Sequence, residues 1–600
     1  MRYALPLLLL TALAAPAAEI VLEPSLRHLR VDGPREWANF PQKPDAASLE
    51  ISFDAAPNAG PATLRLRQQD VKQAWAVTLN GAELGRLDVD EADRVVYFDV
   101  PANTLRATGN TLQVQQLTAR TLVPDDIRVG EIILDGRPRA AVLGEATVEV
   151  SVTESGRPVP ARITVTNSEG ALQTVAADPS ELLAVRPGVI YAGAGRARFR
   201  LPAGAYTFHA GRGFEYSVAT RKLTLKRSQN VKIPLSIERQ VDTAGWVSSD
   251  THIHTFEHSR HGDASVAERL VTLAGEGIEL PIATDHNLHI DYAPVARRLG
   301  LAGFFTPVIG DEVTTPTAHF NVFPVRSAEA KPADQRSPDW GQTLSNIFAT
   351  PGVKVAILNH ARDLHSGVRP FDPSLFDAAT GRPLDSRPFV FNAMETVNSG
   401  AIQTDPLQLF RDWMALLGAG QRVTPVGSSD SHDVARYIVG QGRTYIRVDD
   451  ADVSAIDVEQ AVFNFVQGRV MVSYGLLAEL TVNGKYGPGE TVPALDDELS
   501  VQARVLGPDW VQADRILLFQ DGKLLHEEPI RLADRKQPGV LWTGGWTLPR
   551  PARDSFLNVI ALGPGVSAPY WATAKPYQPM SPEFTPYVLG ASGPVRLDVR

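Results

Sequence analysis

Residues 246–254 read WVSSDTHIH, and this stretch determines the fold that we expect around it. It resembles a β-strand that stops at Asp250, His252 and His254. Side chains two positions apart in a strand point to the same face, so the two histidines can reach one ion together. His258 and His261 follow, which places four of the chain's 13 histidines between residues 252 and 261. An isolated HxH pair is more often structural, but this density favours a metal site.

The same pattern recurs along residues 241–475, where apolar runs stop at residue types that bind metals. The later runs end at or near Asp285 and His286, Glu312 and His319, His360, Glu395, and Asp430 with His432. Helical patterns at 265–277, 405–420 and 457–468 lie between some of these runs. Alternating strands and helices predict a parallel βα array. A parallel barrel collects its carboxyl strand ends on one face, so the sequence predicts a metal cluster at one rim of a barrel.

The flanking regions have the short, alternating runs of β proteins. Residues 19–137 predict a β-sandwich, and WAVTLNGAELGRLDV within it resembles the jelly-roll domains related to galactose-binding modules. That domain is either a scaffold or a site for a carbohydrate partner. Residues 138–240 predict a second β domain that resembles Ig-like or carboxypeptidase-regulatory-like sandwiches, and residues 476–600 predict a C-terminal β-sandwich.

Composition narrows the location and the ligand chemistry. A net charge of -10 argues against a nucleic-acid partner. Residues 1–18 combine a basic start, an apolar run and small residues, which predicts a signal peptide and a periplasmic or secreted protein. The alternative is an N-terminal anchor, but the run is short for a bilayer span, so we expect no stable membrane insertion. The chain has no cysteine, so His, Asp and Glu must bind any metal, a set that suits Zn, Mn or Fe.

Four motifs in residues 241–475 carry a resemblance to a known family: DTHIH, TDHN, GDE and SSDSH. They resemble the PHP (polymerase and histidinol phosphatase) metallohydrolases, and within them the branch that includes bacterial carbaryl hydrolases. The resemblance implies a distorted (β/α)7 barrel and two to three divalent metal ions. It therefore implies a multidomain chain in which this PHP barrel is flanked by the N-terminal β domains and the C-terminal β-sandwich.

The resemblance also implies which residues bind each ion. The first ion would take His252, His254, Glu312 and Asp430, and Glu312 would bridge to a second ion held by His319 and His360. A third would take His286, His432 and one residue after the HIH motif. Asp263, His261 and His258 are the alternatives for that position, and the resemblance favours Asp263. Asp250 and Asp285 would orient neighbouring histidines or act as occasional ligands, and Glu395 with Asn398 would line the pocket or support a ligand.

Clustered divalent ions activate water, which favours hydrolysis of an ester-type bond by a metal-bridging hydroxide. We expect a small-molecule substrate, most simply a phosphoester, with a carbamate or carboxyl ester as the alternative. A carbohydrate-binding surface protein with a non-catalytic metal site is the second alternative. The expected catalytic residues are His286, Asp430 and Arg443. Substrate binding is assigned to Arg362, Arg436, Arg443 and His289, although the arginines could instead form salt bridges and His289 could belong to a lid.

Overall fold

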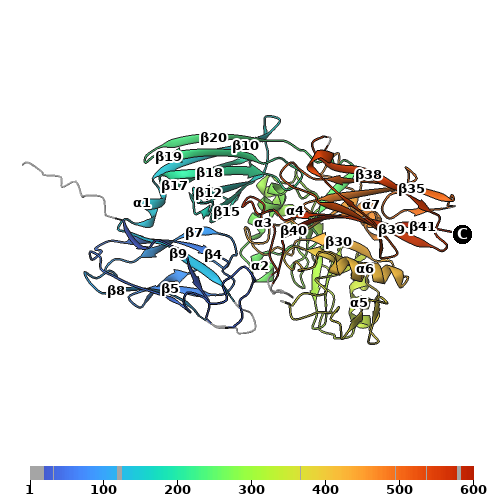
Figure 1. The fold of residues 1–600 in the computed structure, drawn as a ribbon, viewed down its shortest axis with the longest axis horizontal. Coiled ribbons are helices and arrows are strands. Elements are labelled where there is room, and N and C mark those ends of the chain that lie inside the picture. Colours follow the sequence, from blue (N-terminus) through green and yellow to red (C-terminus); the bar gives the residue numbers. More distant parts are fainter. Residues whose placement is uncertain are drawn as a thin grey trace, which may run out of the picture.

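The computed structural model describes residues 19–31, 33–117, 125–364, 366–493, 495–535, 537–576 and 583–599. β-sheets dominate the molecule, and the helices gather in its central and yellow-green parts (Figure 1). The predicted signal peptide lies outside the described residues. None of the described helices combines the length and apolar character that a bilayer crossing requires.

The N-terminal half begins with one continuous sheet and a smaller sheet packed against it. The smaller sheet has the order β3 (Leu49–Phe53), β8 (Asn110–Gln116), β5 (Trp75–Leu79) and β6 (Ala82–Arg86). The large sheet has the order β1 (Ile20–Glu23), β9 (Ile127–Asp135), β4 (Ala62–Gln69), β7 (Arg94–Val100), β13 (Leu172–Gln173), β12 (Ala161–Asn167), β16 (Val189–Ala192) and β15 (Leu183–Arg186). Three further strands pair at its sides: β2 (Arg27–Leu29) with β9, β18 (Gly204–Gly211) with β12, and β19 (Ala219–Leu225) with β18. The parallel pairing of β7 with β13 carries this sheet across residue 137.

A third sheet covers the second half of the large one and encloses an apolar core with it. Its order is β11 (Arg157–Pro158), β10 (Ala146–Glu154), β17 (Arg196–Leu201) and β14 (Ala176–Ala177), with β20 (Asn230–Ile237) beside β10. The short helix α1 (Arg139–Leu143) leads into it. Alternate residues of β10 and β17 are buried, as expected for strands with one face on a core.

The strands in the middle of the chain, residues 241–475, belong to several different sheets. One has the order β24 (Asp311–Thr314), β25 (His319–Phe323), β26 (Val355–Leu358), β29 (Ala393–Asn398) and β30 (Thr424–Ser428), and two small sheets pair β22 (Ile282–Ala283) with β23 (Val308–Ile309) and β27 (Phe376–Asp377) with β28 (Arg382–Pro383). The helices here are α2 (Phe256–Ser259), α3 (Val266–Gly275), α4 (Ala293–Leu299), α5 (Trp340–Ala349), α6 (Gln408–Gly418) and α7 (Val458–Val466).

The remaining central strands join the C-terminal region in one sheet. Its order is β21 (Trp246–Ser249), β31 (Arg443–Arg447), β32 (Val470–Tyr474), β40 (Tyr587–Ser592), β39 (Ser555–Pro564), β36 (Arg515–Gln520) and β37 (Lys523–Pro529), with β41 (Val595–Leu597) and β34 (Thr491–Val492) at its side. A last sheet has the order β33 (Leu477–Val482), β35 (Glu498–Leu506) and β38 (Val540–Pro549), and the 3-10 turn η1 (Leu532–Asp534) precedes β38.

The predicted distorted (β/α)7 barrel is wrong: the strands of residues 241–475 belong to separate sheets, and the described residues form no closed barrel. The reason lies in the connections. No helix separates β24 from β25 or β30 from β31, and β25 pairs antiparallel with both β24 and β26. The β21, β31 and β32 strands are also antiparallel neighbours. Among the strands of residues 241–475, parallel pairing is confined to β22 with β23, β26 with β29 and β29 with β30.

Strand ends nevertheless meet without a closed barrel. Single parallel bridges join Ile253 to Ser431 and His286 to Glu312. The first links the segment after β21 to the segment after β30, and the second links the segment after β22 to β24. The apolar side chains of β21, β26 and β30 are buried in one core cluster beneath them. Rigid, buried strands therefore deliver the polar residues that follow them to one place.

Candidate metal centre

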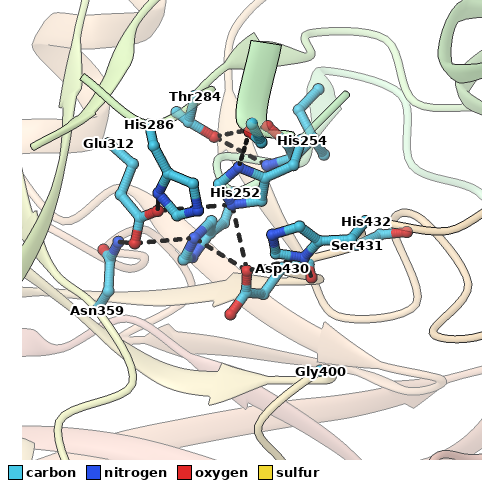
Figure 2. A network of polar contacts seen from close by, with 12 residues as sticks. His252, His254, Thr284, His286, Glu312, Asn359, Gly400, Asp430, Ser431 and His432 are labelled. Atoms are coloured by element: carbon cyan, nitrogen blue, oxygen red, sulfur yellow. Dashed lines mark hydrogen bonds and ion pairs between the residues drawn. The ribbon is translucent and has the colours of Figure 1, made fainter. Parts of the chain in front are cut away.

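Glu312 on β24 stands at the centre of a buried group of histidines (Figure 2). Its Oε1 lies 3.3 Å from His252 Nε2, 3.2 Å from His319 Nδ1 and 3.6 Å from His360 Nε2. Its Oε2 lies 3.6 Å from His254 Nε2. Residues up to 108 positions apart in the sequence thus surround a single carboxylate, as the strand-end pattern predicted they would.

Asp430 approaches the same histidines from the opposite side (Figure 2). Its Oδ1 lies 3.2 Å from His252 Nε2 and 3.3 Å from His254 Nε2. The Asp430 backbone has a left-handed φ of 53°, which is uncommon for a residue other than glycine and indicates local strain. A Cβ on Gly400 would come within 2.9 Å of Ser429 O, so only glycine lets that loop lie against the Asp430 turn.

The ligand atoms form three compact groups: His252, His254 and Asp430; His252, Glu312 and His360; and His254, His286 and His432. Two ligand atoms that each lie about 2.1 Å from a tetrahedral ion are about 3.4 Å apart. The separations around His252 and His254 have this size. They are too long for hydrogen bonds of normal strength and match ligands that share an ion.

Several of these atoms are buried without a hydrogen-bond partner among the described residues. They are His252 Nε2, His254 Nε2, His319 Nδ1, His360 Nδ1, His432 Nε2 and Glu312 Oε2. A buried polar atom without a partner is costly, so a group of them at one point is evidence that something else binds there. Imidazole nitrogens and carboxylate oxygens fit a divalent transition metal, so the residues present fit the implied ions.

Hydrogen bonds on the far side of each ring set which nitrogen faces the centre. His254 Nδ1 donates to Ser259 Oγ over 3.0 Å, and His432 Nδ1 donates to the carbonyl oxygen of Asp430 over 3.0 Å. In these two histidines Nδ1 carries the proton, and Nε2 is left as a lone pair for an ion. His286 differs, because its Nδ1 lies 2.5 Å from Glu312 Oε2 as well as 2.9 Å from Thr314 Oγ1.

Glu395 on β29 supports the centre rather than entering it. Its Oε1 accepts hydrogen bonds from His252 Nδ1 and Ser428 Oγ, both at 2.6 Å. Its Oε2 accepts from the backbone N–H of His360 at 2.5 Å and from Asn398 Nδ2 at 2.9 Å. One buried carboxylate therefore fixes the His252 tautomer and the backbone that carries His360, which is the outer role expected for it.

The two aspartates that precede ligand histidines act on the backbone and on hydroxyl groups. Asp250 accepts from the N–H of Ser429 at 3.1 Å and of Gly440 at 2.7 Å. Asp285 accepts from Ser259 Oγ at 2.7 Å, and that hydroxyl is the one that His254 Nδ1 contacts. Asp285 therefore orients His254 through a serine, a link that the sequence pattern did not reveal because Ser259 is 26 residues away.

The structure does not bring Asp263, the favoured third-group ligand, to the cluster. Arg186 Nε donates to its Oδ2 at 2.6 Å, and the Val434 N–H donates to its Oδ1 at 2.7 Å. His261 lies nearer to this group. Its ring stacks on His432 and His286 at centroid distances of 4.2 and 5.1 Å, and its Nδ1 donates to Ser259 O.

The residues expected to bind substrate are engaged elsewhere. Arg362 forms a two-point pair with Asp412, with N–O distances of 2.5 and 2.9 Å, and Arg436 does the same with Glu91 at 2.9 and 2.6 Å. Arg443 is fully buried and donates to the carbonyl oxygens of Gly440 and Glu276. His289 is also buried, with Nδ1 on Ala330 O and Nε2 3.5 Å from Asp311. In the structure, the contacts of these four side chains are therefore with other protein groups, and their roles in catalysis and substrate binding stay predictions.

Burial and neighbouring charge divide the histidines into two kinds. Burial alone would lower the pKa of His252, but Asp430, Glu395 and Glu312 outweigh it and raise the pKa well above its usual value. Burial and neighbouring histidines instead hold the pKa of His254 and of His432 well below the usual value. The neutral imidazoles that metal binding requires are thus favoured at His254 and His432. At His286 burial would also lower the pKa, but Glu312 and Asp430 outweigh it and raise the pKa.

Asn359 is the clearest residue of the site that the sequence pattern missed. Its Nδ2 donates to Glu312 Oε1 at 3.0 Å and to Asn321 Oδ1 at 2.9 Å. It directly precedes His360 at the end of β26, so its position after a buried apolar run was the available signal. The bond from Asn359 limits Glu312 to one orientation.

Comparisons with known proteins add no family. The sequence matches no family model and no curated protein. Similar solved structures include β-glucuronidase 3 of Bacteroides uniformis, at 10% identity and a TM-score of 0.18 over 91% of this chain and 84% of that one. The Parabacteroides merdae β-glucuronidase has 9% identity and a TM-score of 0.17 over 97% and 87%. The minor pilin GBS52 of Streptococcus agalactiae has 12% identity and a TM-score of 0.16 over 36% and 97%. At such scores these likenesses support no conclusion about fold or function.

Proposed function

We propose that this protein is a metal-dependent hydrolase that cleaves an ester-type bond in a small molecule. The observation that supports the proposal is the set of unpartnered imidazole and carboxylate atoms around Glu312 and Asp430. Two or three divalent ions bound there would lower the pKa of a water molecule and stabilise charge that develops on the substrate. The residues fit such ions in type, in spacing and in tautomer.

The protein's own groups have separable tasks in this proposal. Glu395 and Ser259 keep His252 and His254 in the orientation that offers Nε2 to the centre. Asn359 and Asn398 hold Glu312 and Asp430 by single hydrogen bonds of 3.0 and 3.3 Å. The side chains of His286 and Asp430 are 24% and 17% exposed, so both can exchange a proton with a substrate.

Within this class we favour an uncharged carboxyl or carbamate ester over the phosphoester. A phosphate clamp normally uses arginine, and Arg362 and Arg436 are held in two-point pairs with carboxylates while Arg443 is buried away from solvent. A phosphoester is the second candidate, because divalent ions alone can bind phosphoryl oxygens.

The test is turnover by the metal-loaded protein on p-nitrophenyl acetate, a naphthyl carbamate, p-nitrophenyl phosphate and bis-p-nitrophenyl phosphate. Asp430→Asn should reduce kcat/KM on the active compound by roughly a hundredfold or more, since it removes a ligand and a proton acceptor. Asp452→Asn, at an exposed aspartate that contacts only Ser454 nearby, is the matched control. Equal turnover of wild type and Asp430→Asn would reject the hydrolase and favour a non-catalytic metal site.

A further inference from the structure

A second polar cavity lies where four parts of the chain meet. Its volume is about 360 Å3. The walls come from the loop before β7, the β12–β13 region, the segment after His432, and the C-terminal tail near residues 567–575. This volume is within the range of small-molecule sites. No residue of the metal centre lines it.

The cavity wall is rich in charge, and most of that charge is already neutralised. Glu91 pairs with Arg436 at 2.6 Å, and Lys575 pairs with Asp70. Asp93 accepts two bonds from Arg67, at 2.7 and 2.6 Å. Each of these carboxylates therefore has a cation of its own, and none is left to neutralise a further arginine.

Arg162 is the exception. Its side chain is 6% exposed, its NH1 donates to Tyr191 Oη at 3.2 Å, and its Nε is buried without a hydrogen-bond partner among the described residues. Its one nearby carboxylate, Glu276, is 3.9 Å away and already accepts the Tyr191 hydroxyl at 2.6 Å. Burial raises the pKa of Glu276, which weakens it further as a counterion.

Arg94 adds a second unsatisfied donor to the same wall. Its side chain is 4% exposed and pairs with Asp90 and, at 3.4 Å, with Asp88, but its Nε also has no hydrogen-bond partner among the described residues. An unpartnered buried N–H on a charged group is expensive, and Arg94 and Arg162, which each carry one, both line this one cavity.

We propose that this cavity binds a small oxyanion, a carboxylate or a phosphate group, through Arg162 with help from Arg94. Guanidinium groups present several N–H donors in one plane and match the oxygens of such anions. The site lies between the N-terminal sheets, the 435–441 segment and the C-terminal tail, so a bound anion would connect these parts. This proposal does not depend on the function of the metal centre.

The test uses the full chain with inorganic phosphate and with malonate, followed by calorimetric titration at constant ionic strength set with NaCl. His252→Ala serves as the background, because it disables the metal centre as a competing anion site. We expect saturable binding of at least one anion there, and roughly a tenfold or larger rise in Kd when Arg162→Met is added. Tighter phosphate binding would identify a phosphate ligand, and tighter malonate binding a carboxylate.

A second variant covers the case in which Arg162→Met fails to fold. Ala574 also lines the cavity, and Ala574→Glu leaves Arg162 in place while supplying a carboxylate of the protein's own. It should abolish anion binding and raise the Tm in the absence of added anion. Binding that is unchanged in either variant, or the absence of saturable binding in the His252→Ala background, would overturn the proposal.

Discussion

A single carboxylate, Glu395, holds in place the side chain of one proposed ligand and the backbone of another. It accepts from His252 Nδ1 and from the His360 N–H, and these residues follow β21 and β26, which do not pair with each other. An anionic acceptor makes the opposite ring nitrogen a stronger donor to an ion. The positions of His252 and His360 therefore depend on Glu395, a residue that we do not place among the ligands.

Glu395→Gln should weaken metal binding without removing a ligand. The neutral amide accepts less strongly and can misplace the His252 proton, so we expect affinity to fall roughly ten- to a hundredfold. Competition with a chelator, read by elemental analysis, measures this. Glu329→Gln, at an exposed glutamate, is the control and should bind as wild type does. Unchanged affinity in Glu395→Gln would refute the orienting role.

The identity of the third-group ligand is a second residue-scale prediction. His261→Ala should lose one bound ion, because its ring stacks on His286 and His432 and its Nδ1 is engaged by Ser259 O, which leaves Nε2 as the nitrogen available to an ion. Asp263→Asn should keep the full metal content and lose only stability, because the aspartate is paired with Arg186. Metal-to-protein ratios after gel filtration separate the two outcomes, and the reverse pattern would restore Asp263 as the ligand.

At the scale of elements, α3 shows how local sequence positions the segment between β21 and β22. Ser265 accepts from the Glu268 N–H while the Glu268 side chain accepts from the Ser265 N–H, which is a complete capping box. Arg269 on the same helix is fully buried and donates to the carbonyl oxygens of His254 and Ser431. The capped start of α3 therefore positions Arg269, whose hydrogen bonds join the turn at His254 to the turn at Ser431.

Ser265→Ala should lower the free energy of unfolding by about 1 kcal/mol, the usual loss when a helix N-cap is removed. Urea denaturation measures it. Ser265→Thr keeps the hydroxyl and should stay within a few tenths of a kcal/mol of wild type. A loss of the same size in both variants would show that packing, not the cap, determines the effect.

Elements also explain what the sequence could and could not predict. Apolar runs that end in histidine or carboxylate correctly pointed to residues that lie together, such as His252, Glu312 and Asp430. Their roles as ligands stay a prediction. The barrel was wrong because a run such as 319–323 reads the same in a parallel or an antiparallel strand, and its pairing depends on neighbours distant in sequence. Partners such as Arg186 for Asp263 come from another region and leave no local signal.

At the scale of the whole molecule, an ion pair between Glu91 and Arg436 connects the N-terminal sheets to the segment that carries the proposed metal centre. Burial alone would raise the pKa of Glu91, but Arg436 and Lys72 outweigh it and lower the pKa to about 2. A lowered folded-state pKa means that the carboxylate stabilises the fold above its unfolded pKa of about 4.3, and that this contribution is lost as pH falls toward 2.

Glu91→Gln should therefore be less stable than wild type at pH 6, and the difference should shrink as pH falls from about 4.3 toward 2. Chemical denaturation of both proteins across that pH range measures the difference in their free energies of unfolding. Other titrating groups are the same in both proteins, so their contributions cancel in this difference. Glu50→Gln, whose carboxylate lies at the surface near Gln113, is a suitable control and should show no such trend. A difference that is constant with pH would contradict the lowered pKa.

The pairing of β32 with β40 has a practical consequence for anyone who dissects this chain. Met471 to Tyr474 are hydrogen-bonded to Leu589 to Ser592, so one edge of β32 is paired by residues near the C-terminus. A fragment that stops at residue 475 would leave the backbone N–H and C=O groups along one edge of β32 unpaired. Exposed strand edges of this kind pair with other chains and cause aggregation. Expression of residues 241–475 alone should therefore yield aggregated protein. A soluble fragment must extend past residue 592.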